Sequence, residues 1–194
     1  MASIIINGNT SGGITLSAPD VAGSNTQTLV AATGTLAPLV AGTAVSASGT
    51  SVDFTGIPSW VKRITVMFSG VSTNGTSVAQ LQLGTSGGIQ STGYAGSTNV
   101  TSSAATTTSV ITSGIALYGS FSAVQSLAGS VVLTLLDSAS GIWSASVILA
   151  RTDAASAGYG GWVKTLSGTL DRIRITTVNG TDTFDAGSIN ILYE

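Results

Sequence analysis

Histidine and cysteine are both absent from this chain of 194 residues, and only 7% of its residues are charged. Without histidine, the chain lacks the commonest general base and the commonest protein ligand of transition metals. Without cysteine, it has neither a disulfide framework nor thiol chemistry, so either redox compartment would suit it. The sequence therefore predicts no catalytic residue, no cofactor and no metal site, and it favours a protein that is not an enzyme.

Charge is scarce and is not clustered. An ordinary soluble domain is about 25% charged, whereas this chain has six basic and eight acidic residues and a net charge of −2. Its basic residues are scattered apart from Lys62-Arg63 and the pair Arg172 and Arg174, so we expect no nucleic-acid partner. A surface with few ions to desolvate is covered by a neighbouring molecule at low cost.

Long apolar runs are also missing. No stretch approaches the roughly 20 apolar residues that would span a bilayer, so we expect no membrane partner. The start, MASIIING, lacks the basic and apolar regions of a secretory signal. We therefore expect synthesis in a cytoplasm, from which a larger particle could carry the protein outside a cell.

The first 45 residues contain three short β-type runs joined by glycine and asparagine turns. These predicted strands are Ala2–Ile6, Gly13–Ser17 and Gln27–Ala31. So small a segment cannot bury enough apolar surface to fold alone, and we expect it to order against copies of itself or a larger body. Pro38 and two glycines punctuate the following run, which predicts a boundary near Gly42–Ala44. Residues 1–43 are accordingly expected to form an extended β stem and residues 44–194 a head domain.

The head domain is predicted to be all-β, because no window shows a capped apolar stripe at helical spacing. About nine closely spaced strands indicate a jelly-roll-like β-sandwich. The predicted strands are Val45–Phe54 (broken at Ser48-Gly49), Val61–Phe68, Ala79–Leu83, Val110–Tyr118, Ser130–Leu136, Ile142–Ala150, Gly161–Leu166, Arg172–Val178 and Ser188–Tyr193.

Alternation within these runs predicts which side chains face the core. In Ala79–Leu83 we expect Leu81 and Leu83 to point inward and Gln80 and Gln82 to point outward. In a half-exposed strand near the C-terminus, arginines and isoleucines alternate between positions 172 and 175. Two further stretches are predicted as loops: residues 84–109, with one short strand near Ile89–Thr92, and residues 153–160, which contain Tyr159.

Four aromatic residues are the candidate contact sites: Trp60, Trp143, Trp162 and Tyr159. Tryptophan can stack on a sugar ring, but it more often lies in a sandwich core or at a subunit interface. The eight carboxylates include no evident glycosidase pair. Asp182 and Asp185 could hold Ca²⁺ in the last hairpin loop, although a turn in which aspartate accepts local backbone N–H groups is the simpler interpretation.

Several stretches of the chain are similar to known proteins. The start, SIIINGNTSGGITLSAPDVAGSNTQTLVAATGTL, resembles the N-terminal segment of many tailed-bacteriophage virion proteins, except that Val30 follows Thr28-Leu29 where proline is usual. The stretches DFTGIPSWVKRITVMFSGVSTNGTS, SVVLTLLDSASGIWSAS and LDRIRITTVNGTDTFDAGSINILYE resemble a C-terminal head domain of phage and prophage fibre-like proteins. Residues 84–129 are matched least.

The resemblance implies a homotrimeric protein of the virion surface with an N-terminal anchor and an outward head. One hypothesis is a capsid decoration protein, either a cement protein or a head fibre, whose arm binds the major capsid protein or another virion protein. The alternative is a tail fibre or receptor-binding protein that contacts host surface glycan, although no shaft is visible in the sequence. A glycan-degrading enzyme is disfavoured by the missing acid–base signature.

Overall fold

A computed structural model describes residues 3–7, 13–17, 37–119 and 121–194, and the chain divides into two compact units, Met1–Leu36 and Ala37–Glu194. In the first unit, β1 (Ser3–Asn7) pairs antiparallel with β2 (Gly13–Ser17). The side chains of Ile5 and Ile6 on β1 are exposed.

Two of the three strands predicted in the first unit are present. The strand predicted at residues 2–6 lies one residue later, at Ser3–Asn7, and Gly13–Ser17 has the predicted bounds. The third, Gln27–Ala31, lies outside the described residues.

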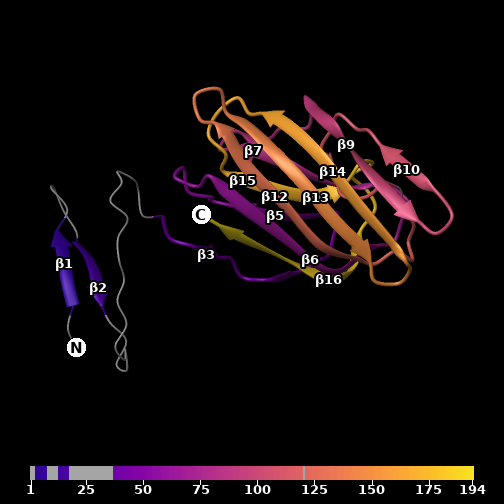
Figure 1. Cartoon of the computed structure of the whole chain (residues 1–194), viewed down its shortest axis with the longest axis horizontal. Helices are drawn as coiled ribbons and strands as arrows, with labels where there is room; N and C mark the ends of the chain where they lie inside the picture. Colours follow the sequence, from indigo (N-terminus) through magenta and orange to yellow (C-terminus); the bar gives the residue numbers. More distant parts are fainter. Residues whose placement is uncertain (1–2, 8–12, 18–36, 120) are drawn as a thin grey trace. The chain divides into compact units, whose positions relative to one another are not determined.

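The second unit is all-β throughout its described residues, and every strand pairing is antiparallel. Its large sheet has nine strands in the order β10-β9-β14-β13-β12-β6-β16-β3, with β4 also pairing with β16 (Figure 1). These strands are β3 (Val40–Ala41), β4 (Val45–Ser46), β6 (Arg63–Thr73), β9 (Tyr94–Ser102), β10 (Thr106–Ser109), β12 (Leu127–Asp137), β13 (Ile142–Arg151), β14 (Ser156–Thr165) and β16 (Phe184–Tyr193).

The small sheet has five strands in the order β11-β7-β15-β5, with β8 pairing with β7. Its strands are β5 (Ser51–Thr55), β7 (Ala79–Thr85), β8 (Gly88–Ile89), β11 (Ile115–Ala116) and β15 (Arg172–Thr177). The chain passes repeatedly from one sheet to the other, and the buried side chains of both sheets form one core cluster. The second unit is therefore β-sandwich-like, as the spacing of the predicted strands indicates.

Alternating side chains place the core between the two sheets. On β13, Trp143, Val147 and Leu149 are buried, whereas Ser146 and Ile148 are exposed. The same alternation on β15 buries its isoleucines and leaves its arginines partly exposed, as predicted. These patterns are those of strands with one face on a core and one face outside.

The prediction that Gln80 and Gln82 point outward is wrong. The first six residues of β7 are all buried. Gln80 Nε2 donates to Thr177 O (3.3 Å), and its Oε1 accepts from Ser113 Oγ (2.8 Å). Gln82 Nε2 donates to Ser113 O (2.8 Å). Buried amides are tolerated because these bonds replace those to water.

The loop predicted at residues 84–109 is also largely wrong. It contains β8, β9 and β10, and β9 pairs with both β10 and β14. Thr98 of β9 is fully buried, and its Oγ1 donates to Ala116 O (2.7 Å). A strand of hydroxyl residues and glycine lacks the large apolar residues by which alternation is recognised.

The predicted and observed strands also differ in extent at two other places. Within the strand predicted at residues 110–118, only Ile115–Ala116 forms β11. The loop predicted at residues 153–160 ends early, because β14 begins at Ser156.

The first compact unit ends at Leu36 and the second begins at Ala37. This division comes earlier in the chain than the domain boundary predicted near Gly42–Ala44. Gly42 N donates to Ile191 O (2.8 Å), and Asn190 Nδ2 donates to Gly42 O (3.1 Å). The segment around β3 therefore belongs to the edge of the large sheet.

Candidate functional site

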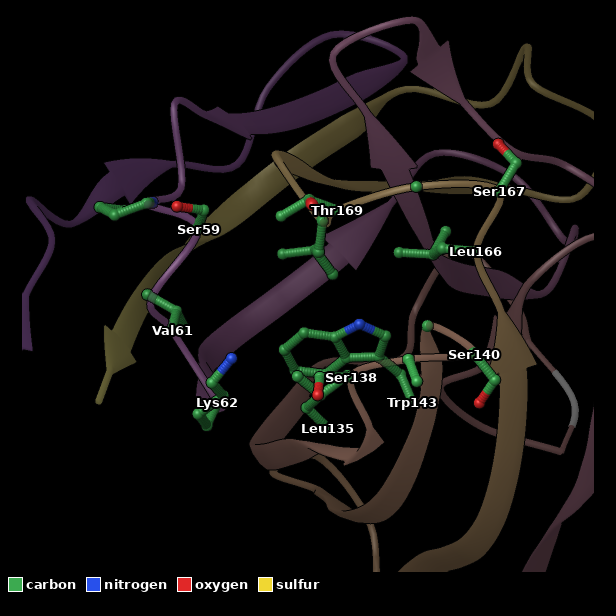
Figure 2. A pocket seen from close by; sticks show the side chains of 15 residues that line it. Ser59, Val61, Lys62, Leu135, Ser138, Ser140, Trp143, Leu166, Ser167 and Thr169 are labelled. Atoms are coloured by element: carbon green, nitrogen blue, oxygen red, sulfur yellow. The ribbon is translucent and has the colours of Figure 1, made fainter. Parts of the chain in front are cut away.

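A pocket of about 370 Å³ lies where three connections of the second unit meet (Figure 2). Residues 58–62 lead into β6, residues 138–141 form the hairpin between β12 and β13, and residues 166–170 join β14 to β15. Figure 2 shows Trp143 between Lys62 on one side and Ser140 and Leu166 on the other. We call this cavity the Trp143 pocket.

Backbone hydrogen bonds hold the three connections together. Leu135 N donates to Lys62 O (2.8 Å), which ties β12 to the first connection. Leu166 N donates to Gly141 O (3.0 Å), which ties the third connection to the hairpin. These two bonds hold the walls of the pocket against each other.

The hairpin in the wall is ordered by Asp137. Its carboxylate accepts from Ala139 N (3.0 Å), Ser140 N (3.1 Å) and Ser140 Oγ. The Ser140 hydroxyl, followed by the two backbone N–H groups, lowers the pKa of Asp137. Residues 137–141 thus form a turn in which an aspartate carboxylate accepts local backbone N–H groups.

The lining of the pocket combines hydroxyl groups with apolar surface. The hydroxyls belong to Ser59, Ser138, Ser140, Ser167 and Thr169. Val61, Leu135, Leu166 and Leu170 supply apolar carbons. Lys62 is the only charged residue of the lining, and it belongs to none of the ion pairs found among the described residues.

The two tryptophans of the large sheet have different partners. Both are 4% exposed. Trp162 Nε1 donates to Thr98 Oγ1 (2.9 Å) in the core. Trp143 lines the pocket, and its Nε1 has no acceptor in the part of the chain that the structure describes; Figure 2 shows this nitrogen on the side of the ring toward Leu166 and Thr169.

The other two predicted aromatics are exposed and are not among the residues that line the pocket, although Trp60 lies between two lining residues in the first connection. Trp60 is 38% exposed, and its ring centroid lies 5.8 Å from that of Tyr193 at a tilt of 49°. Tyr159 is 51% exposed on β14. The four aromatics therefore do not form one stacking platform: Trp143 and Trp162 are buried, as the core interpretation predicts.

Tyr159 belongs to a broad surface with little charge, the solvent-facing side of the large sheet, which we call the outer face. Strand register defines four rows across it. They are Asn190–Met67–Ser130–Ile148–Tyr159–Asn99–Thr108, Ala41–Leu192–Thr65–Val132–Ser146–Gly161–Ser97, Arg63–Thr134–Ser144–Val163–Ala95 and Ala128–Ala150–Ala157–Thr101–Thr106. Arg63 is the only charged residue in these rows. Ile148 and Tyr159 are cross-strand neighbours in the first row.

The Asp182 and Asp185 carboxylates already have partners within the protein. Asp182 accepts from Ser77 N (2.9 Å) and Asn179 Nδ2 (2.7 Å), and Asp185 accepts from Ser72 Oγ. The bond from Asn179, and then that from Ser77, lowers the pKa of Asp182. These contacts favour the turn interpretation over a calcium loop.

The described residues contain neither a cluster of potential metal ligands nor a membrane-spanning helix. Across residues 3–7, 13–17, 37–119 and 121–194, no three acidic, histidine or cysteine side chains gather as a metal site would require. The same part of the chain contains no helix that is long and apolar enough to cross a membrane.

Among the pocket residues, sequence reasoning singled out only Trp143. Lys62 and the hydroxyl residues come from three connections far apart in the chain, and no spacing links them. Hydroxyl residues are also so frequent throughout the sequence that none of them stands out. No local signal could have indicated the pocket.

In comparisons with known proteins, no family model, no curated protein and no solved structure matches this chain.

Proposed function

We propose that this chain is a non-enzymatic structural protein of a bacteriophage virion, and specifically a trimeric capsid decoration protein, either a cement protein or a head fibre. It is made in the host cytoplasm and carried on the virion surface. Residues 1–43 attach it to the major capsid protein or to another virion protein, and the sandwich forms the head. The resemblance of its N-terminal and C-terminal segments to phage proteins supports this proposal.

The structural observation that carries the proposal is the low charge of the outer face together with its exposed Ile148 and Tyr159. Ile148 on this face is 69% exposed and Tyr159 is 51% exposed, with hydroxyl, amide and small apolar residues around them. Such a surface loses little hydration energy when a neighbour covers it, because the charged groups to be desolvated on its four rows are Arg63 and the Glu194 carboxylate that pairs with it. Exposed apolar surface with a polar surround is typical of association sites. A homotrimer in which copies cover this face is the arrangement that we propose.

Two finer structural assignments belong to the same proposal. The repeated passage of the chain between the sheets supports a jelly-roll-like sandwich. The exposed Ile5 and Ile6 on a hairpin of only two strands support an N-terminal stem that is stabilised by neighbouring chains.

Deletion of residues 1–36 tests the attachment, because it removes the first unit and leaves β3 paired with β16. Particles that lack the protein are mixed with the full chain or with the truncated chain, and the bound protein is measured after sedimentation. We expect the full chain to bind and the truncated chain to remain soluble and unbound. The double variant Ile5→Ser with Ile6→Ser should weaken attachment, whereas Val110→Ser, at a similarly exposed position of the second unit, should not. Attachment of the truncated chain would refute the anchor.

A tail fibre or receptor-binding protein is the second candidate, and the Trp143 pocket is the observation that favours it. Hydroxyl-lined pockets with an aromatic side chain suit saccharides. The copy number per particle separates the two roles: a decoration protein is present in hundreds of copies, a tail fibre in a few trimers. Binding of the isolated head to a glycan array would favour the second role.

A further inference from the structure

We propose that the Trp143 pocket binds a single acidic saccharide residue, such as a uronic acid, whose carboxylate pairs with Lys62. The inference concerns the head alone and holds for a decoration protein as well as for a receptor-binding protein.

The size of the pocket suits one sugar residue. Its volume of about 370 Å³ lies near the lower end of small-molecule sites, which span about 300–1,000 Å³. Because the backbone bonds from Leu135 to Lys62 and from Leu166 to Gly141 fix the walls, little ordering is needed on binding. A preformed pocket loses less free energy to ordering than a mobile one.

The unused hydrogen-bonding groups of the lining match a polyol. In the described residues, the hydroxyls of Ser59, Ser138 and Thr169 make no side-chain hydrogen bond. Ser167 Oγ accepts from Gln90 Nε2 (2.6 Å), which leaves its own proton to donate. Each hydroxyl can both donate and accept, as sugar hydroxyls do.

Trp143 is the most buried of these unused donors. Its side chain is 4% exposed and lines the cavity, yet its indole N–H has no acceptor in the described residues, unlike the N–H of Trp162. In the described residues this nitrogen is not among the fully buried polar atoms that lack a partner. It is therefore open to the cavity, and its N–H can donate to a ligand oxygen there. The nearby carbons of Leu135 and Leu170 can receive the C–H side of a sugar ring.

Charge selects an acidic sugar over a neutral one. Lys62 is the single charged group of the lining, and no carboxylate of the described residues pairs with it. The adjacent Arg63, in contrast, pairs with Glu194 (3.3 Å). One ammonium group matches one carboxylate, and the resulting bond is charge-assisted.

The experiment uses the ¹⁵N-labelled full chain, whose three tryptophans give three indole N–H signals. The signals are assigned with Trp60→Phe and Trp143→Phe. D-Glucuronate is titrated against the protein, with D-glucose and inorganic phosphate as separate probes at the same ionic strength. We expect glucuronate to shift the Trp143 signal with saturation, while the Trp162 signal, which is bonded to Thr98, stays in place and reports an intact core.

Two variants test whether the charge of Lys62 contributes to glucuronate binding. Lys62→Gln should weaken glucuronate binding about fivefold, because it removes a charge-assisted bond at a residue that is itself exposed. Arg63→Gln removes the same charge at the adjacent residue and should change the affinity less than about twofold, as expected for an exposed charge outside the site. Glucose should bind Lys62→Gln and the original chain equally weakly.

Three results would each overturn the inference. The first is no saturable shift of the Trp143 signal with glucuronate. The second is an equal effect of Lys62→Gln and Arg63→Gln. The third is binding of phosphate or glucose as strong as that of glucuronate, which would show simple anion attraction or a neutral sugar site. None of these results bears on particle attachment through the N-terminal residues, which the deletion of residues 1–36 tests separately.

Discussion

Tyr94 is a buried phenol whose oxygen joins two parts of the chain. Leu83 N donates to its oxygen (2.6 Å), and its O–H donates to Gln90 O (2.9 Å). Lys164 Nζ lies 5.4 Å from the centroid of its ring. Burial raises the pKa of Tyr94 to about 12, against a smaller lowering by the Leu83 N–H. Burial also lowers the pKa of Lys164.

Alkaline pH is therefore expected to destabilise the head through Tyr94. The native state holds the phenol proton more tightly than the unfolded chain, so this stabilisation is complete below pH 10 and is lost as the pH rises toward about 12. Denaturant unfolding between pH 9 and pH 12 measures it, at constant ionic strength. Tyr94→Phe should reduce the fall in the free energy of unfolding across this range by up to about 1.4 kcal/mol per pH unit. An unchanged slope in this variant would contradict the assignment.

Between β9 and β14, the two backbones approach closely at Gly96. Its φ is +152°, and a Cβ there would lie 2.3 Å from Gly161 O and 2.7 Å from Trp162 Cα. Only glycine can adopt this φ readily and leave room for the backbone of β14. This requirement explains a glycine in the middle of a strand that sequence reasoning assigned to a loop.

Gly96→Ala is expected to destabilise the head by about 3 kcal/mol or more, because strain and the steric clash act together. Gly161→Ala on the facing strand is the matched control, since its Cβ would meet nothing within 4 Å, and its effect should stay within about 1 kcal/mol. Urea unfolding of both variants measures the difference. Equal stability of the two would mean that β9 and β14 do not pair in this register.

A second prediction concerns β3, which pairs with β16 at the edge of the large sheet. A chain that begins at Ala37 keeps β3 and the Gly42–Ile191 bond, whereas one that begins at Ala44 loses both. We expect the shorter chain to be less stable by about 1–3 kcal/mol, from lost hydrogen bonds and newly exposed edge groups. Thermal and urea unfolding measure this. Identical stabilities would place the boundary of the head near residue 43 instead.

For the whole molecule, the proposed trimer makes the outer face responsible for association. Ile148→Lys would place a charge in the interface, and Val110→Lys is its control, because both side chains are 69% exposed and Val110 lies outside the four rows. Sedimentation velocity of the full chain should give a trimer that Ile148→Lys dissociates and Val110→Lys preserves. A monomeric full chain, or equal behaviour of the two variants, would exclude association through this face.

Much of the architecture follows from local pattern. Strands such as β6, β13 and β15 alternate large apolar with polar residues, and this period can be read without any neighbour because it belongs to the strand itself. The turn at residues 137–141 is equally local, because the Asp137 carboxylate accepts the backbone N–H groups of Ala139 and Ser140, two and three residues further along the chain.

The remaining features depend on neighbours that the sequence does not name. β9 is a strand because β10 and β14 supply its hydrogen bonds, and Gln80 and Gln82 are buried because Thr177 and Ser113 accept their N–H groups. The Trp143 pocket exists because three connections distant in the chain meet and are bonded together. Local alternation is a property of one strand, whereas pairing, polar burial and pocket walls arise only when separate strands come into contact.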